Sequence, residues 1–107
     1  MPIATVDGLD LYFERAGVGP PLLFISGTGG DLRNKPNVFD GPLAKRFDLL
    51  AYDQRGLGQS AKPDVAYCMA DYADDAAALM ANQGWDEASV IGVSFGGMVA
   101  QELAIRH

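Results

Sequence analysis

Residues 21–25, PLLFI, form an apolar run without polar alternation, and this run constrains the fold more than any other segment. A strand with one solvated face alternates apolar and polar residues, whereas an uninterrupted run is typical of a strand buried on both faces. Further short strands are predicted over residues 47–52 and 88–93, with helical patterns between and after them. Strands that alternate with helices indicate the α/β class, with a mostly parallel sheet covered on both faces.

The other elements follow from local patterns. Two strands over residues 3–6 and 9–15 flank Gly8 and predict a hairpin, and helices are expected over residues 38–47, 71–83 and 95–106. In the helix over 71–83, Asp71 is expected to cap the start, and Asp74 and Asp75 to favour the positive end of the dipole. The expected inner stripe of this helix is Tyr72, Ala76, Leu79, Met80 and Gln83.

Composition excludes several classes of protein. A chain of 107 residues has the size of one domain, and its net charge of -6 disfavours binding to nucleic acid. No apolar run reaches the ~18 residues of a membrane helix, so no membrane association is expected. The first residues lack the basic and apolar regions of a signal peptide, and the single cysteine fits a reducing, cytoplasmic setting.

The segment from Gly92 to Gly96, GVSFG, matches the pattern G-x-S-x-G between an apolar strand and a helix. A serine nucleophile must stand above the sheet, so the chain turns sharply there and Ser94 takes a strained backbone conformation. Side chains two positions before and after the serine would collide in that turn, which explains glycine at both. The start of the following helix directs backbone N–H groups toward a developing oxyanion. The motif therefore predicts a nucleophilic serine.

Three blocks together resemble the N-terminal part of an α/β-hydrolase-fold enzyme: the glycine loop after Ile25, DQRGLGQS over residues 53–60, and GVSFGG over 92–97. They have the order and separation seen in that family, and the chain is most similar to its enol-lactonase, esterase and cofactor-free haloperoxidase branch. The resemblance implies a mostly parallel sheet of strand order 1-2-4-3-5 with an antiparallel N-terminal hairpin. It also implies that residues 1–107 are a single partial domain, without the C-terminal strands, lid, acid and histidine.

The resemblance also implies roles for individual residues. Ser94 is the expected nucleophile, and the N–H groups of Phe95 and Thr28 are the expected oxyanion-hole donors. Ser26 stands where the family commonly has histidine, which makes the assignment of Thr28 less direct than that of Phe95. The residues expected to support the site structurally are Gly27, Gly92, Gly96, Asp53 and Arg55. For Asp53 and Arg55 we expect ion pairs and hydrogen bonds that hold their loop rather than a catalytic role.

The triad of this family runs Ser, then Asp or Glu, then His. The single histidine, His107, follows Ser94 by one helix, about 20 Å away at about 1.5 Å per residue, so it is not the expected base. We therefore expect the acid and base to lie outside this chain, which would be the front part of a longer hydrolase. The strand over Ala88–Val93 would then be a sheet edge, open to self-association or to a complementing chain.

Other kinds of site fit the sequence less well. The segment GLGQSA over residues 56–61 satisfies G-x-G-x-x-A, but Pro63 prevents the helix that a dinucleotide site requires. One cysteine and one histidine cannot form a zinc site, and no cofactor is expected. Cys68 is expected to be buried, and Trp85 to anchor a helix–strand corner.

The predicted function is that of a serine hydrolase acting through an acyl-enzyme on a small ester, lactone or activated carbonyl. The alternative is a non-catalytic relative or fragment that binds a small ligand or assembles with a partner.

Overall fold

A computed structural model of the protein describes residues 2–107. The strands are β1 (Ile3–Val6), β2 (Leu9–Ala16), β3 (Pro21–Ile25), β4 (Asp48–Tyr52) and β5 (Ser89–Gly92). The helices are the 3-10 turn η1 (Val38–Asp40), α1 (Leu43–Arg46), α2 (Met69–Asn82) and α3 (Phe95–Arg106). None of these helices is both long and apolar enough to cross a bilayer.

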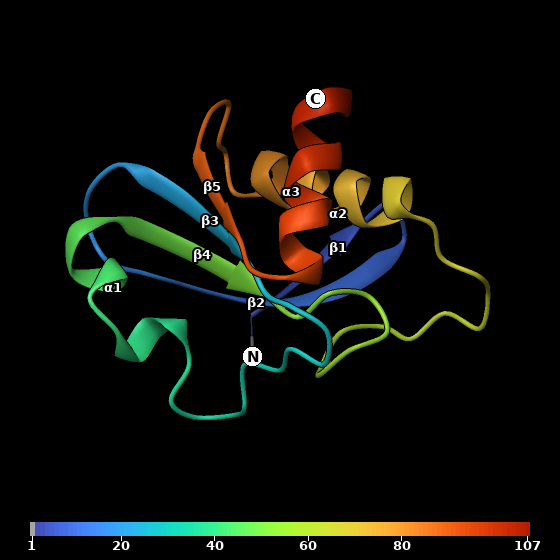
Figure 1. Cartoon of the computed structure of the whole chain (residues 1–107), viewed down its shortest axis with the longest axis horizontal. Coiled ribbons are helices and arrows are strands. Elements are labelled where there is room, and N and C mark those ends of the chain that lie inside the picture. Colours follow the sequence, from blue (N-terminus) through green and yellow to red (C-terminus); the bar gives the residue numbers. More distant parts are fainter. Residues whose placement is uncertain (1) are drawn as a thin grey trace.

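The strands form one mixed sheet in the order β1-β2-β4-β3-β5, which confirms the expected α/β fold and strand order (Figure 1). β1 and β2 pair antiparallel, as the hairpin prediction required, and β2 also pairs antiparallel with β4. β3 lies parallel between β4 and β5. The carboxyl ends of three parallel strands therefore meet at one end of the sheet, where an α/β fold places its ligands.

Each face of the sheet has its own apolar core. On one face, Leu23, Ile25 and Leu50 pack with residues of α2 and α3. On the other face, Tyr12 and Ala51 pack against Leu32, with part of η1 alongside. The two central strands β3 and β4 are thus covered on both faces, as their unalternated apolar sequences predict.

The helix predicted over residues 38–47 is wrong as one element. The structure has η1 and the four-residue α1 instead, separated by Gly41 in an extended conformation (φ -96°, ψ -170°). Pro42, which follows, has no N–H to donate to a preceding turn, so a helix that begins before it cannot continue through it.

The helix predicted to begin at Asp71 begins two residues earlier, with Cys68 as its N-cap. Asp71 is therefore the third helical residue, and its carboxylate accepts the Cys68 N–H at 2.8 Å. Asp74 and Asp75 lie beyond the first turn, so the dipole role expected for them is wrong. Cys68 is exposed rather than buried. Of the expected inner stripe, Ala76 and Leu79 are buried, and Tyr72 and Met80 are partly buried and pack against the same core. The stripe also includes Ala73 and Asp75, which the sequence pattern did not indicate.

Arg15 joins β2 to β4 by a two-bond ion pair with Asp48, at 2.9 and 2.7 Å. The guanidinium holds the pKa of the Asp48 carboxyl below its usual range. An acid whose pKa is lowered by folding stabilises the fold above its unfolded pKa of about 4, and this contribution disappears as pH falls through the lowered folded pKa.

We expect Asp48→Asn to lower the free energy of unfolding by about 0.5–1 kcal/mol at neutral pH, because the pair is partly exposed. The difference from wild type should vanish in strong acid. Urea titrations at several pH values measure it, with Asp86→Asn, an exposed carboxylate without an ion pair in the described structure, as the control. A pH-independent deficit in Asp48→Asn would contradict the ion-pair explanation.

Candidate active site

Ser94 lies at the turn between β5 and α3, with φ 55° and ψ -117°. It is one of two non-glycine residues with positive φ in the described chain, the other being Asp7 of the hairpin turn. The turn is closed by hydrogen bonds from the Gly96 N–H to the Val93 carbonyl and from the Gly97 N–H to the Ser94 carbonyl, each 2.9 Å. Ser94 is exposed, so the sharp turn presents its side chain at the carboxyl end of the parallel strands.

Two glycines allow this turn to pack closely. A Cβ at Gly92 would overlap the Gly96 carbonyl and lie 2.7 Å from Gly97 Cα. A Cβ at Gly96 would overlap the backbone carbonyls of Ile25 and Ser26 at the end of β3. The start of α3 therefore rests directly on the main chain of β3. Any side chain at these two positions would move the helix away from the sheet.

The loop after β3 lies beside the serine. A Cβ built on Gly27 would be 3.3 Å from Ser94 Cβ and 3.9 Å from Ser94 Oγ. The loop turns through a hydrogen bond from the Gly30 N–H to the Gly27 carbonyl at 3.1 Å, with Thr28 exposed inside the turn. Within the described residues, the N–H groups of Thr28 and Phe95 donate to no protein acceptor. Two uncommitted amide donors thus come from the two segments that flank Ser94.

A hollow of about 280 Å³ opens beside this loop. It is lined by Thr28 and its glycine neighbours, by Leu32 and Asn34, and by residues at the end of β4. Ser94 does not line it, so the hollow adjoins the serine across the loop rather than enclosing it.

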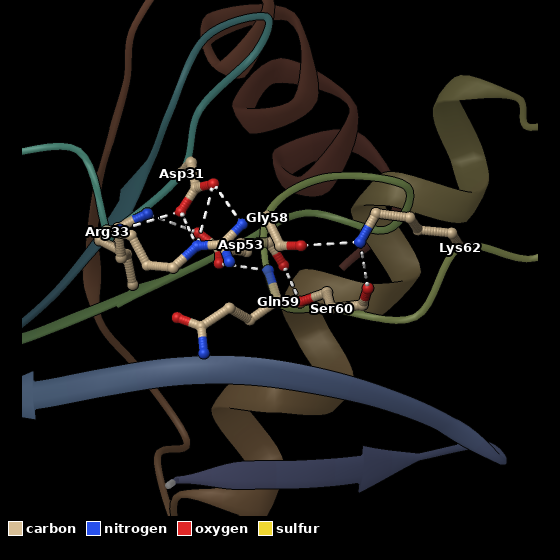
Figure 2. Close-up of polar contacts among 8 residues, drawn as sticks. Asp31, Arg33, Asp53, Gly58, Gln59, Ser60 and Lys62 are labelled. Carbon is tan, nitrogen blue, oxygen red and sulfur yellow. Dashed lines mark hydrogen bonds and ion pairs between the residues drawn. The ribbon is translucent and has the colours of Figure 1, made fainter.

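Asp53 holds the loop after β3 against the loop after β4 (Figure 2). Its carboxylate accepts the Leu32 N–H at 2.8 Å and the Gln59 N–H at 2.9 Å, and its carbonyl accepts the Ser60 hydroxyl at 2.5 Å. Burial raises the pKa of the Asp53 carboxyl above its usual range, although the two amide hydrogen bonds oppose this rise. These contacts fix the backbone of both loops.

Arg55 forms a two-bond ion pair with Asp75 of α2, at 2.7 and 2.8 Å. The side chains are only 17% and 8% exposed, so this pair is largely removed from solvent. The guanidinium also lies 5.5 Å from the centre of the Tyr67 ring. Tyr67 contacts Tyr72 edge-on, and Tyr72 contacts Phe95 in the same way at 5.0 Å. A continuous chain of contacts therefore connects the loop after β4 to the residue that follows Ser94.

Sequence reasoning missed the partners of these residues. The Arg55–Asp75 pair joins positions 20 residues apart, and only the register of α2 determines that Asp75 faces inward. Gln54 was also missed: it is 1% exposed, and its Nε2 donates to the Ser26 carbonyl at 2.9 Å. A polar residue directly after a buried strand was the available signal, but it did not identify the partner.

His107 lies at the far end of α3, where its Nε2 is 2.9 Å from Asp74 Oδ1. The 12 residues of α3 correspond to about 18 Å of helix, well beyond hydrogen-bond reach of Ser94. Within residues 2–107, no group of three or more His, Cys, Asp or Glu side chains could hold a metal ion. The described residues thus supply a serine and two amide donors at this site, without a histidine.

The positive φ of Ser94 predicts an unusual response to glycine. Strain of this type costs about 1–3 kcal/mol, whereas the extra flexibility of glycine costs about 0.5–1 kcal/mol. We therefore expect Ser94→Gly to be more stable than Ser94→Ala by about 1 kcal/mol in chemical denaturation. The control pair is Ser89→Gly and Ser89→Ala in the regular strand β5, where glycine should be the less stable variant. The same sign at both positions would contradict strain at Ser94.

Comparisons with known proteins agree with this architecture. The family model described as the alpha/beta hydrolase fold matches residues 20–107. A soluble epoxide hydrolase of Corynebacterium sp. is 35% identical over 91% of this chain and 34% of its own length. The acetyltransferase component of the acetoin cleaving system of Cupriavidus necator is 40% identical over 95% of this chain and 27% of its own.

Among solved structures, the enol-lactonase from Burkholderia xenovorans LB400 superimposes with a TM-score of 0.88 and 32% identity. The match covers 99% of this chain and 42% of the enol-lactonase. The chain belongs to the alpha/beta hydrolase family, as its sequence motifs predict. It spans between about a quarter and two fifths of the length of these three relatives.

Proposed function

We propose that this chain carries the nucleophile and the oxyanion donors of a serine hydrolase that acts on a small ester, lactone or activated carbonyl. The observation that carries this proposal is the backbone of Ser94, which is held at φ 55° between β5 and α3 with its side chain exposed. A strained, exposed serine at a strand-to-helix turn is the arrangement expected for a nucleophile. Such a nucleophile also requires donors to the oxyanion, and the N–H groups of Phe95 and Thr28, which have no protein acceptor among the described residues, support this role.

In the proposed reaction, Ser94 Oγ attacks the substrate carbonyl carbon while its proton passes to a base that residues 1–107 do not supply. The Phe95 and Thr28 N–H groups stabilise the oxyanion. Collapse of the tetrahedral intermediate expels the alcohol, which takes the proton from the base, and leaves an acyl-enzyme. Water then attacks the acyl group and gives a proton to the base. The base passes this proton to Ser94 Oγ as the bond to the acyl group breaks, which releases the acid product.

The substrate class rests on the site and on the relatives. The two amide donors beside Ser94 suit attack on a carbonyl group, and one similar solved structure is described as an enol-lactonase. We propose no cofactor, because the acyl-transfer steps need only a nucleophile, a base and oxyanion donors. The single thiol, exposed at Cys68, suits the reducing cytoplasm that we propose as its location.

The test joins this chain, as one polypeptide, to the part of the Burkholderia xenovorans enol-lactonase that follows its matched region. We expect this fusion to gain one adduct with a fluorophosphonate, measured by intact mass, and to hydrolyse p-nitrophenyl acetate. Ser94→Ala should abolish both while leaving the circular dichroism spectrum unchanged, and Ser89→Ala should leave both intact. A folded fusion without an adduct would contradict the proposal in favour of a non-catalytic binding module, as would turnover by Ser94→Ala.

A further inference from the structure

The loop after β3 is rich in glycine, and it carries the Thr28 N–H that the proposed function assigns to the oxyanion. Residues 26–30 read SGTGG, and Gly29 has a positive φ of 76°. Glycine loses more conformational freedom on folding than other residues, so such a loop keeps one conformation only when contacts from outside hold it. An oxyanion donor must be in place before the reaction, because a displacement of about 1 Å can lower a rate about 100-fold.

Two consecutive residues after β4 hold the two ends of this loop. At its start, Gln54 Nε2 donates to the Ser26 carbonyl at 2.9 Å. At its end, Asp53 Oδ1 accepts the Leu32 N–H at 2.8 Å. Gln54 and Asp53 are each 1% exposed, so solvent does not compete for either contact. The end of β4 therefore determines where the loop between these two contacts lies.

The Gln54 contact acts on the peptide that lies against Ser94. The carbonyl that it holds belongs to the peptide joining Ser26 to Gly27, and a Cβ built on Gly27 would lie 3.3 Å from Ser94 Cβ. The next peptide along the chain carries the Thr28 N–H. No backbone N–H in the described part of the chain donates to the Ser26 carbonyl, so Gln54 supplies its hydrogen bond. Without this bond the peptide could rotate at Gly27, and the Thr28 N–H would turn with it.

Stability alone does not explain a glutamine at this position. The other amide atom, Gln54 Oε1, is buried and has no hydrogen-bond donor among residues 2–107. The assignment of the two atoms follows from the contact itself, because Oε1 facing the Ser26 carbonyl would place two acceptors against each other. A buried acceptor without a donor destabilises the fold, which offsets the benefit of the Nε2 hydrogen bond. A buried polar group of this kind therefore calls for a role beyond packing.

We propose that Gln54 is a positioning residue for catalysis: its hydrogen bond to the Ser26 carbonyl fixes the peptide beside Ser94 and so directs the Thr28 N–H toward the oxyanion. This inference rests on the proposed function, which supplies the reaction in which the oxyanion forms. Gln54 is buried, so it acts through the loop rather than on the substrate. Its effect is therefore on the transition state, in which the negative charge develops, and not on the binding of the substrate.

The experiment measures Gln54→Met in the single-chain fusion with the enol-lactonase segment. Methionine has a similar length and removes the Nε2 donor together with the unsatisfied Oε1, so the urea midpoint should stay nearly unchanged. With p-nitrophenyl acetate, kcat should fall at least about tenfold while KM changes little. Phenylboronic acid forms a tetrahedral adduct with a nucleophilic serine and so resembles the transition state. It should inhibit the variant at least about tenfold more weakly.

Gln83→Met is the matched control. Gln83 is the C-cap of α2, and its side chain contacts Arg15 and Asn82 rather than the loop after β3. The same substitution there should change neither kcat nor inhibition by phenylboronic acid. Gln54→Asn is a second test variant, because its amide is one methylene too short to reach the Ser26 carbonyl. It should lose kcat as Gln54→Met does.

Three results would overturn the positioning role. The first is wild-type kcat in folded Gln54→Met. The second is a loss of kcat in Gln54→Met with wild-type kcat in Gln54→Asn, since the polarity of the side chain rather than its reach would then matter. The third is a large decrease in the urea midpoint of both variants without weaker inhibition by phenylboronic acid, or loss of the fold in both, as expected of a purely structural residue. A folded fusion with Gln54 intact that is neither labelled nor active overturns the proposed function instead.

Discussion

Gly96→Ala is expected to lower the free energy of unfolding by about 3 kcal/mol, at the upper end of the usual cost of overpacking. The added Cβ would overlap the carbonyls of Ile25 and Ser26, which belong to the main chain and cannot rotate aside. α3 would have to move away from β3 as a unit. Domains of this size are stable by only about 5–15 kcal/mol, so urea denaturation should show a large decrease in the midpoint.

The adjacent residue provides the control. A Cβ at Gly97 would meet the Gly92 carbonyl at 3.5 Å, an ordinary contact, and Gly97 lies in the same turn of α3. Gly97→Ala should therefore leave stability unchanged or raise it by up to about 1 kcal/mol, because alanine favours the helix. Equal losses in the two variants would show that α3 tolerates no added methyl group in this turn, and the close approach to β3 would not be the cause.

Asp75→Ala is the second change with a large expected effect, a loss of about 3 kcal/mol in the free energy of unfolding. Removing the carboxylate leaves the Arg55 guanidinium, 17% exposed, without its two-bond partner. The cost comes from the charge that stays in a partly desolvated position rather than from the net strength of the pair. Replacing both residues with apolar ones, as in Arg55→Met with Asp75→Leu, should restore part of the loss.

Asp74→Ala is the matched control, because Asp74 is the neighbouring residue and also pairs with an arginine, Arg106. That pair is 39% and 44% exposed, so solvent screens it and its removal should cost much less than the removal of Asp75. Urea denaturation of Asp75→Ala, Asp74→Ala and the double variant Arg55→Met with Asp75→Leu measures the free energy of unfolding of each relative to wild type. A loss in Asp74→Ala as large as in Asp75→Ala would contradict the role of burial.

The parts of the fold that sequence predicted are those determined by local pattern. The uninterrupted run over residues 21–25 and the G-x-S-x-G turn placed β3, β5 and α3 to within one or two residues. The start of α2 was misplaced because Cys68 is a rare N-cap, while Asp71 has the chemistry of a common one. The single helix expected over residues 38–47 is divided into η1 and α1 in the structure. Proline is tolerated in the first turn of a helix but not later, and the apolar pattern did not show in which turn Pro42 would lie.

The candidate site likewise contains features that the local sequence predicts and features that depend on tertiary packing. The turn at Ser94 follows from five consecutive residues, whereas the ion pair of Arg55 depends on which face of α2 turns toward the loop after β4. The Tyr72–Phe95 contact likewise requires the packing of α2 against α3. Contacts between distant elements are set by tertiary packing, and no local pattern carries them.

The seam between Gly96 and the carbonyls of Ile25 and Ser26 has an evolutionary consequence. Because Ser94 is positioned there by contacts between main-chain atoms, replacement of the side chains around it leaves this proposed nucleophile in place. The walls of the binding region can therefore diverge in size and polarity without disturbing the reactive atom. A fold built in this way can acquire new substrates through changes in its side chains while the position of the serine oxygen stays the same.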